Sequence, residues 1–175
     1  MKTLFTSFEI QNLIDKISKE IKSHYNSKDG EGIVALVILK GAVFFAADLL
    51  RSLEYPKCRI EFVRVSSYQG NSSSGKIKLH YPIECDLKNQ RVLVIDEIID
   101  TGTTAQYLKE FLQTHQPAEI KFSCLLDKKV CRKINFEADF VGKEIPDQFV
   151  IGYGLDFNEN YRNLSEIKIY EEGSH

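Results

Sequence analysis

The sequence predicts an α/β fold, in which a mostly parallel sheet is flanked by helices on both faces. Two short runs of apolar residues, at 33–39 and 92–95, have the composition of strands that are buried on both faces. Each run is followed by a segment whose apolar residues repeat at helical spacing. Since ligands bind beyond the carboxyl ends of the strands in such sheets, a site is expected after residues 39 and 95.

The elements of the first half follow one another in the order expected for this fold. Apolar residues at helical spacing over 10–21, after the possible caps Thr6 and Ser7, predict an amphipathic helix. Turn-forming residues at 26–30 end this helix. The first buried strand then leads into a second helix over residues 43–53.

The second half contains one further strand-to-helix unit and several short strands. The buried strand at 92–95 leads into a helix over residues 105–112, which ends near Pro117. Four other short apolar runs predict strands: residues 60–65, 120–126, 149–151 and 167–170. Residues 66–75 have almost no apolar content and should form a mobile loop.

Length, composition and charge limit the possible classes of protein. A chain of 175 residues with 43% hydrophobic and 27% charged residues is typical of one globular domain. A formal net charge of −2 and a pI near 6.1 give no long-range attraction to nucleic acid or to an anionic membrane. No apolar run approaches the roughly 20 residues that cross a bilayer, and no signal-peptide pattern is present, so a cytoplasmic location is expected. The four cysteines and four histidines are scattered, without the spacing of a zinc site or a thiolate nucleophile.

The segment 92–104, VLVIDEIIDTGTT, has the residues of a phosphate-binding turn. The N-terminus of a helix attracts anions through its free N–H groups and its dipole, and Gly102 lets the backbone approach a ligand closely. Hydroxyls that can donate further hydrogen bonds belong to Thr101, Thr103 and Thr104. One phosphate monoester fits this description.

The acids of the same segment have two possible roles. The carboxylates of Asp96 and Glu97 can accept hydrogen bonds from sugar hydroxyls, or help to place a magnesium ion that the ligand carries. In the simpler interpretation, Asp100 and Thr101 cap the helix while Asp96 and Glu97 are solvated. The combination of acids, glycine and hydroxyls in one turn favours recognition of a phosphate beside a sugar.

This segment resembles the phosphoribosyl-pyrophosphate motif of type I phosphoribosyltransferases, two acids followed by a D-[ST]-G-x-T loop. The resemblance implies the type I phosphoribosyltransferase fold, with Asp100 as the general acid/base beside purine N7. It also implies a set of residues that bind the ribose and its 5′-phosphate: Asp96, Glu97, Thr101, Gly102, Thr103 and Thr104. The family commonly has Glu-Asp where this chain has Asp96-Glu97, so one carboxylate is moved by a methylene.

Four further segments resemble the hypoxanthine-guanine members of that family: residues 38–45, 66–75, 125–129 and 145–164. In the first, ILKGAVFF, the backbone of Lys40 and Gly41 would face the pyrophosphate, with a cis peptide bond between Leu39 and Lys40. In the second, SSYQGNSSSG, Ser67 and Tyr68 would close over the pyrophosphate and exclude water.

The last two segments would bind the purine and complete the pyrophosphate site. LLDKK places Lys128 beside the purine 6-oxo group, which favours hypoxanthine and guanine over adenine. In IPDQFVIGYGLDFNENYRNL, Phe149 would stack on the purine and the Val150 backbone would meet its edge. Asp156 would reach a magnesium shell and Arg162 the pyrophosphate.

The charged residues that follow Lys128, and Lys143 further along, receive no role. Seen alone, the charges at Lys128, Lys129, Arg132 and Lys133 are typical of a solvated basic face, and only the first receives a function. Lys143 departs from the family, which usually has an aromatic or apolar residue there, and its effect on packing is left open.

The resemblance implies one phosphoribosyltransferase domain over 1–175, with a core over about 1–140, a mobile lid over 66–80 and a hood over about 141–170. It implies transfer of the 5-phosphoribosyl group from phosphoribosyl pyrophosphate to hypoxanthine or guanine, giving IMP or GMP and pyrophosphate. Mg²⁺ is the implied cofactor, and a homodimer or homotetramer the implied assembly.

Three alternatives remain. Xanthine or another 6-oxopurine could be the preferred base, because a single lysine contact does not rank these bases. An RNA-binding regulator on the same fold would need a basic face, which the acidic pI counts against. A nucleotide-binding protein without transferase activity would have lost Asp100 or the lid, and both are present.

Overall fold

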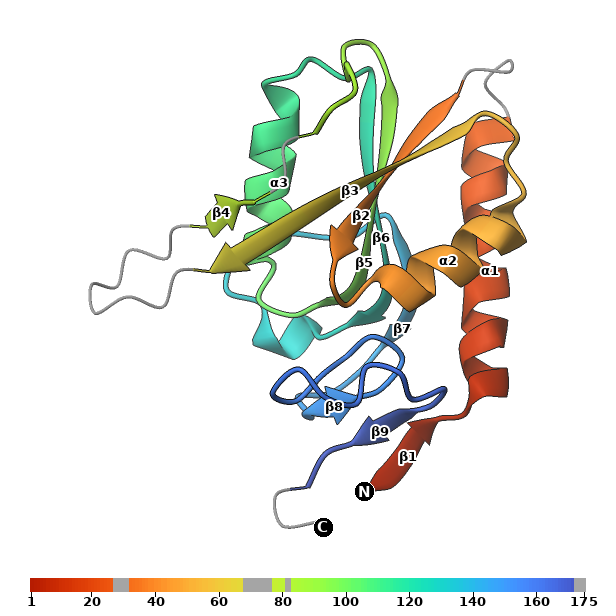
Figure 1. Ribbon diagram of the computed structural model, residues 1–175, viewed down its shortest axis with the longest axis vertical. Coiled ribbons are helices and arrows are strands. Elements are labelled where there is room, and N and C mark those ends of the chain that lie inside the picture. Colours follow the sequence, from red (N-terminus) through yellow and green to blue (C-terminus); the bar gives the residue numbers. More distant parts are fainter. Residues whose placement is uncertain (27–31, 68–76, 81–82, 172–175) are drawn as a thin grey trace.

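The chain folds around a six-stranded sheet with the strand order β4-β3-β2-β5-β6-β7 (Figure 1). The computed structural model describes residues 1–26, 32–67, 77–80 and 83–171. Five strands run parallel: β2 (Ile33–Leu39), β3 (Cys58–Ser67), β5 (Arg91–Ile99), β6 (Glu119–Asp127) and β7 (Phe140–Glu144). The short β4 (Ile77–Leu79) pairs antiparallel with β3. The predicted parallel α/β sheet is confirmed.

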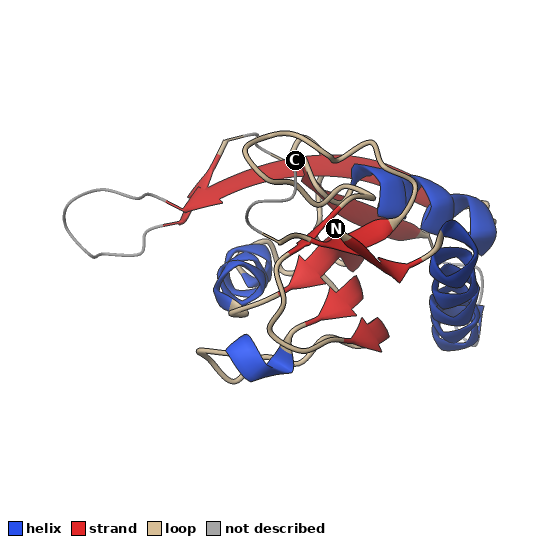
Figure 2. Cartoon of the chain, turned by 90° about the horizontal axis from the view of Figure 1, so that it is seen from below, coloured by secondary structure: helices blue, strands red, loops and turns tan. Residues whose placement is uncertain are grey.

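Helices cover both faces of this sheet (Figure 2). α1 (Ser7–Asn26) and α2 (Val43–Leu53) pack on one face, and α3 (Thr103–Gln113) packs on the other. The strand β2 shows why its sequence is apolar throughout: Ala35 and Val37 join the core under α1 and α2, while Val34 and Leu36 join the core under α3.

A second, three-stranded antiparallel sheet lies beyond the carboxyl ends of the main strands (Figure 1). Its order is β1-β9-β8, formed by β1 (Lys2–Phe5), β9 (Ile167–Ile169) and β8 (Val150–Ile151). The N-terminal strand β1 was not expected from the sequence. The small sheet thus closes over the edge of the main sheet where a ligand is expected.

The strand β5 ends later than the sequence predicted, and this changes the position of two candidate site residues. β5 extends to Ile99, beyond the predicted end at residue 95, so Asp96 and Glu97 belong to the strand itself. Continued pairing with β6, up to Ile99 opposite Asp127, accounts for the extension.

Near the N-terminus, Thr6 caps α1 as predicted, since its hydroxyl accepts from Glu9 N and its own N–H donates to the Glu9 carboxylate.

Of the predicted lid, residues 66–67 and 77–80 belong to the described part of the chain. Ser67 ends β3, whereas Tyr68 and most of residues 66–80 lie outside the described residues. Lys143, whose effect was left open, is exposed on the edge strand β7 opposite Leu126, so its charge stays in solvent. Within the described ranges, the helices are too short or too polar to cross a membrane.

Candidate active site

The predicted phosphate turn, residues 100–104, lines a cavity of about 100 Å³ between the end of β5 and the start of α3. Gly102 stands at the N-cap of α3 with φ 81°, a left-handed conformation that glycine adopts readily and other residues rarely. Gly102, and neither Asp100 nor Thr101, holds the N-cap position, although the Thr101 hydroxyl accepts a hydrogen bond from Thr103 N at 3.3 Å, as the simpler interpretation expected of it. The N-terminus of α3, Thr101 and Thr104 all border the cavity, which suits a phosphate group.

Asp96 and Glu97 lie side by side and are only partly exposed. The Oδ1 atom of Asp96 accepts a hydrogen bond from Glu97 N at 3.0 Å. Burial, followed by the charge of Glu97, raises the pKa of Asp96 well above its usual range. Burial also raises the pKa of Glu97, although its hydrogen bond with Asp96 and the positive charge of Arg162 oppose the shift. Two carboxylates held together in this way are suited to hydroxyl donors or a cation.

These two acids connect separate parts of the site. Asp96 lines the cavity of the phosphate turn. Glu97 reaches the other way, toward the loop after β2, where a Cβ atom on Gly41 would overlap its carboxylate. A ligand bound across both regions would therefore pass the two carboxylates.

Replacing Asp96 with asparagine should stabilise the free protein at neutral pH. A carboxyl with a raised pKa takes up its proton more readily in the folded state, so the wild type loses stability as the pH rises from the usual carboxyl range through the raised pKa. Asparagine has no such charge and keeps an acceptor for Glu97 N. In magnesium-free buffer, the variant should have a higher Tm than the wild type at pH 8, and the difference should shrink towards pH 4.

A matched variant, Asp86→Asn, changes an exposed carboxylate outside the site and should show no comparable difference between the two pH values. A Tm difference for Asp96→Asn that is the same at pH 8 and pH 4 would contradict the proposed cause.

The loop after β2 has the conformation that the sequence resemblance implied. The peptide bond between Leu39 and Lys40 is cis, as expected. The chain segment of Gly154 lies directly against this loop, since a Cβ atom there would overlap the backbone carbonyl oxygen of Gly41. The loops that were predicted to bind pyrophosphate are thus in contact.

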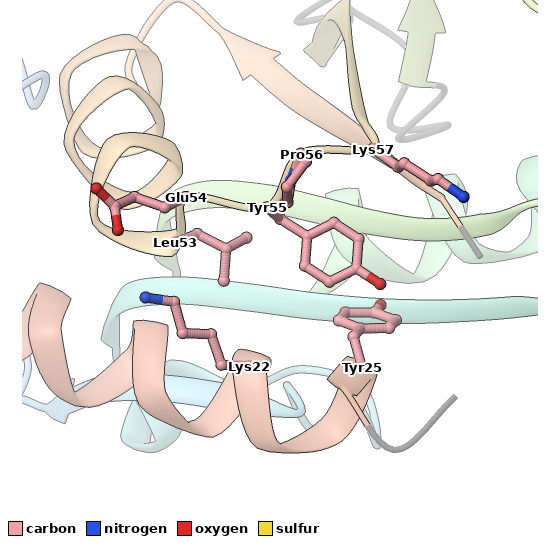
Figure 3. A pocket seen from close by; sticks show the side chains of 7 residues that line it. All are labelled: Lys22, Tyr25, Leu53, Glu54, Tyr55, Pro56 and Lys57. Carbon is pink, nitrogen blue, oxygen red and sulfur yellow. The ribbon is translucent and has the colours of Figure 1, made fainter. Parts of the chain in front are cut away.

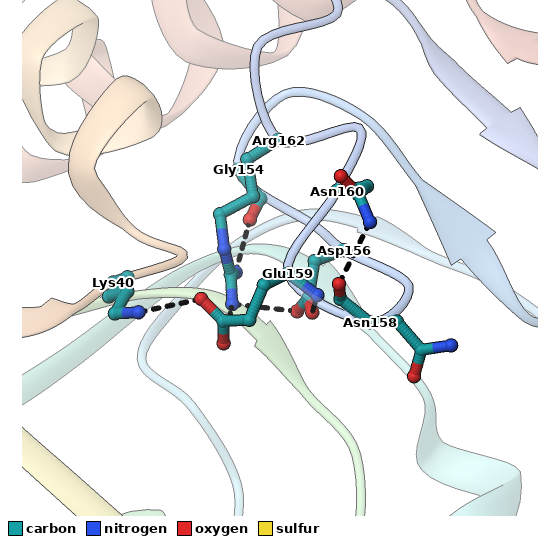
Figure 4. Close-up of polar contacts among 7 residues, drawn as sticks. All are labelled: Lys40, Gly154, Asp156, Asn158, Glu159, Asn160 and Arg162. Atoms are coloured by element: carbon teal, nitrogen blue, oxygen red, sulfur yellow. Dashed lines mark hydrogen bonds and ion pairs between the residues drawn. The ribbon is translucent and has the colours of Figure 1, made fainter.

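The side chains of Arg162 and Asp156, which were predicted for pyrophosphate and magnesium, lie together with the Lys40 side chain around Glu159 (Figure 4). Lys40 Nζ lies 2.6 Å from a carboxylate oxygen of Glu159, and Arg162 Nη2 lies 3.3 Å from the other oxygen. Arg162 also pairs with Asp156 at 2.8 Å and donates to the Gly154 carbonyl at 2.7 Å. Lys40, which donates a hydrogen bond to the Glu159 carboxylate, is the main reason that the pKa of Glu159 is lowered. A phosphate that displaced the Glu159 carboxylate would have both cations as partners.

The predicted purine-binding residues lie at the ends of β6 and β8. Lys128 follows β6 and is only 7% exposed, with Asp147 3.8 Å from its Nζ atom. Phe149 is 50% exposed and makes edge contacts with Phe157 and Tyr170. The buried cation and the exposed aromatic face are the two features that a 6-oxopurine needs.

The backbone of Val150 faces an open strand edge. The Phe149 carbonyl accepts from Tyr170 N at 2.9 Å, and consecutive residues of an antiparallel strand direct their backbone groups to opposite sides. The N–H and C=O of Val150 therefore point away from β9, at the free edge of β8. This orientation suits the backbone contact that was predicted.

Sequence reasoning missed two charged residues of this region. Glu159 joins Lys40 to Arg162, and Arg132 binds the buried Asp127 and the backbone carbonyl of Asp100. The basic-face interpretation is therefore wrong for Arg132 and for Lys128, both of which are largely buried. Only the acidic residue that precedes Lys128 in LLDKK hinted that a cation could be held inside.

A larger cavity of about 330 Å³ lies at the opposite end of the sheet, between the C-terminal ends of α1 and α2 (Figure 3). Tyr25 and Tyr55 point toward each other there, with their ring centroids 6.4 Å apart. Lys22 is engaged by the Ser52 carbonyl at 2.9 Å. Its lining has one acid, Glu54, in place of the carboxylate pair of the site above, and it lies at the amino end of the strands.

Comparison with known proteins identifies the family of the chain. Residues 6–158 match the family model of the phosphoribosyl transferase domain. The chain is 41% identical over 173 residues to a hypoxanthine-guanine phosphoribosyltransferase of Aquifex aeolicus, which covers 98% of this chain and 96% of that protein. It is 38% identical over 167 residues to the protein of the same name from Staphylococcus aureus strain Mu50, with 95% and 91% covered.

Solved structures give the same result for the fold. A hypoxanthine phosphoribosyl transferase of Trypanosoma cruzi, studied for the role of its C-terminal region in oligomeric state and activity, superimposes with a TM-score of 0.92 and 37% identity, covering 98% of this chain and 91% of that one. A hypoxanthine-guanine phosphoribosyltransferase of Bacillus anthracis, which holds a HEPES molecule in its active site, gives a TM-score of 0.91 at 37% identity, with 98% and 99% covered.

Proposed function

This chain belongs to the phosphoribosyltransferase family, among its hypoxanthine-guanine enzymes of purine salvage, and we propose how its residues carry out the reaction. The 5-phosphoribosyl group passes from phosphoribosyl pyrophosphate to hypoxanthine or guanine, which gives IMP or GMP and pyrophosphate. The residues 1–175 act as one domain in this proposal.

One observation carries the assignment of residues. Asp96 borders the phosphate turn while Glu97 borders the Lys40-Gly41 loop, so the two proposed anion sites would lie on either side of one pair of carboxylates. Phosphoribosyl pyrophosphate has the same order of groups: a 5′-phosphate, a ribose with hydroxyls, and a diphosphate. The turn at 100–104 would bind the 5′-phosphate, and Lys40 and Arg162 would bind the diphosphate.

The reaction separates charge, and the chain has groups for each part of it. Positive charge develops on the sugar and negative charge on the leaving pyrophosphate, so electrostatic stabilisation and orientation matter more than a covalent nucleophile. Lys40 and Arg162 stabilise the leaving group, while Lys128, Phe149 and Val150 orient the purine. Asp100 accepts or returns a proton at purine N7 as N9 attacks the sugar.

Magnesium fits this site as a partner of the ligand. No group of three or more acidic, histidine or cysteine side chains in the described part of the chain could hold a metal ion by itself. Asp96, Glu97 and Asp156 nevertheless offer hard oxygen ligands, and Mg²⁺ in enzymes is often held by one or two carboxylates together with substrate phosphates. The ion, when bound, neutralises charge on the diphosphate.

We further propose that the enzyme works in the cytoplasm as a homodimer or homotetramer. Four large apolar side chains support an assembly because they are 40–49% exposed: Val43 and Phe44 on α2, Ile60 and Phe62 on β3. Sedimentation of the purified chain distinguishes dimer from tetramer, and a monomer at micromolar concentration would contradict the proposal.

The function is tested by release of pyrophosphate from phosphoribosyl pyrophosphate with hypoxanthine, guanine, xanthine and adenine, each with and without Mg²⁺. Hypoxanthine and guanine should be used and adenine should not, and removal of magnesium should abolish the reaction. The rates with xanthine decide how far other 6-oxopurines are accepted. A protein that consumes none of the four bases would contradict the proposal.

Lys128→Gln should lower kcat/KM for hypoxanthine and guanine. A hydrogen bond from a charged donor contributes about 1.5–3 kcal/mol, which corresponds to a loss of roughly 10- to 150-fold. The discrimination against adenine should fall with it, since the glutamine amide can also accept from an amino group. The control is Lys129→Gln, which removes an exposed lysine that pairs with Glu137 and Glu144, and equal losses in both variants would contradict a specific role of Lys128.

A further inference from the structure

Arg132 forms a buried bridge beside the proposed site. Its side chain is 12% exposed, and its partner Asp127 at the end of β6 is 0% exposed. The Nη2 atom of Arg132 pairs with Oδ1 of Asp127, and the Nη1 atom donates a hydrogen bond of 2.6 Å to the backbone carbonyl of Asp100. One guanidinium thus connects the strand that leads to Lys128 with the turn that carries Asp100.

The backbone reinforces this connection. The N–H of Lys128 donates to the carbonyl of Ile99 at 2.9 Å, and the N–H of Lys133 donates to the carbonyl of Thr101 at 3.1 Å. The alkyl part of Arg132 also lies under Gly102, where an added Cβ atom would be 2.9 Å from Arg132 Cδ. The segment 128–133 is therefore hydrogen-bonded to residues 99–101 at three of its positions, Lys128, Arg132 and Lys133.

The contacts of Arg132 with Asp127 and with the Asp100 carbonyl depend on both the charge and the shape of arginine. Asp127 is fully buried, and its Oδ2 atom has no hydrogen-bond partner among the described residues, so Arg132 is its closest compensating charge. A guanidinium presents its donors in a fixed fork and can bind a carboxylate and a carbonyl at once. The single ammonium group of lysine keeps the charge but does not reproduce the fork.

We propose that Arg132, anchored by Asp127, is a positioning residue of the transferase reaction that fixes the phosphate turn and Asp100 relative to the purine-binding Lys128. This inference rests on the roles proposed above for the turn and for Lys128. Arg132 acts through the Asp100 backbone and the turn, and it touches neither substrate in this arrangement.

Two ligands separate this role from a general effect on stability. A nucleoside monophosphate such as GMP uses both the turn and the purine-binding residues, so its binding depends on their relative position. Pyrophosphate binds at Lys40 and Arg162, which Arg132 does not contact. Loss of the Arg132 bridge should therefore weaken binding of GMP and leave binding of magnesium pyrophosphate unchanged.

The experiment measures the Kd of GMP and of magnesium pyrophosphate by calorimetry, together with kcat, for the wild type and Arg132→Lys. The variant should bind GMP about tenfold or more weakly, the effect of losing one charge-assisted hydrogen bond, with a similar fall in kcat. Its Kd for pyrophosphate should stay within about twofold of the wild-type value. The control Lys129→Gln changes a residue of the short helix η1 (Lys129–Cys131), which directly precedes Arg132, and should change neither Kd.

Asp127→Asn is the second variant, because it keeps the shape and one acceptor for Arg132 but removes the anchoring charge. It should weaken GMP binding and lower kcat by a smaller factor than Arg132→Lys. If Arg132→Lys does not fold, Asp127→Asn provides the test. Equal weakening of both ligands, or no weakening of either, would overturn the inference. A wild type that binds no GMP would instead reject the proposed function itself.

Discussion

Replacing Asp100 with asparagine should lower turnover by roughly 10²–10⁴-fold, the range that is typical for a general acid/base. Asp100 is exposed at the mouth of the phosphate turn, beside the place proposed for purine N7. Asparagine keeps the size of the side chain but accepts no proton. The measurement is kcat for the forward reaction with hypoxanthine at saturating phosphoribosyl pyrophosphate.

The same variant should keep its fold and bind IMP nearly as well as the wild type, because the proposed contacts of the turn with the 5′-phosphate are made by backbone groups and threonine hydroxyls. Asp86→Asn, an exposed carboxylate outside the site, serves as the matched control and should turn over normally. Near-wild-type kcat in Asp100→Asn would remove Asp100 from the proton transfer.

Gly154→Ala should severely impair the use of phosphoribosyl pyrophosphate. Gly154 has φ 100°, and a Cβ atom there would overlap the carbonyl oxygen of Gly41. Forced adoption of such a backbone costs about 1–3 kcal/mol, or the loop moves away and separates Arg162 from Lys40. We expect KM for phosphoribosyl pyrophosphate to rise by roughly 5- to 150-fold, together with a lower Tm.

The control for this variant is Asn163→Ala, which changes an exposed residue of the same chain segment without adding volume. KM and Tm of this control should match the wild type. If Gly154→Ala also kept the wild-type KM, the close packing of the two loops would have no part in binding the diphosphate.

The sequence predicted the main elements because their signals are local. The run at 33–39 is apolar throughout since both of its faces are buried, and this was visible without a structure. The strand β1 was missed because four residues carry almost no periodicity. Its pairing with β9 joins the two ends of the chain, and no pattern within either segment reports that contact.

The candidate site could be predicted where its residues are neighbours in the chain. The turn from Asp100 to Thr104 could be proposed because the acid, glycine and hydroxyls stand together in the chain. Glu159 could not, since its function depends on Lys40, which lies 119 positions away. Arg132 had the pattern of a solvated charge until its burial against Asp127 became visible.

From the sequence alone we could therefore predict the alternating strands and helices, the turn at 100–104 and the chemical type of the groups around it. These depend on the order and spacing of neighbouring residues. The pairing of charges could be seen only in the folded chain: Lys40 and Arg162 meet at Glu159, and Arg132 pairs with Asp127 while it donates to the Asp100 backbone carbonyl. The reason is that the strength of an ion pair depends on distance and burial, and both are set by how strands distant in the sequence are arranged in the sheet.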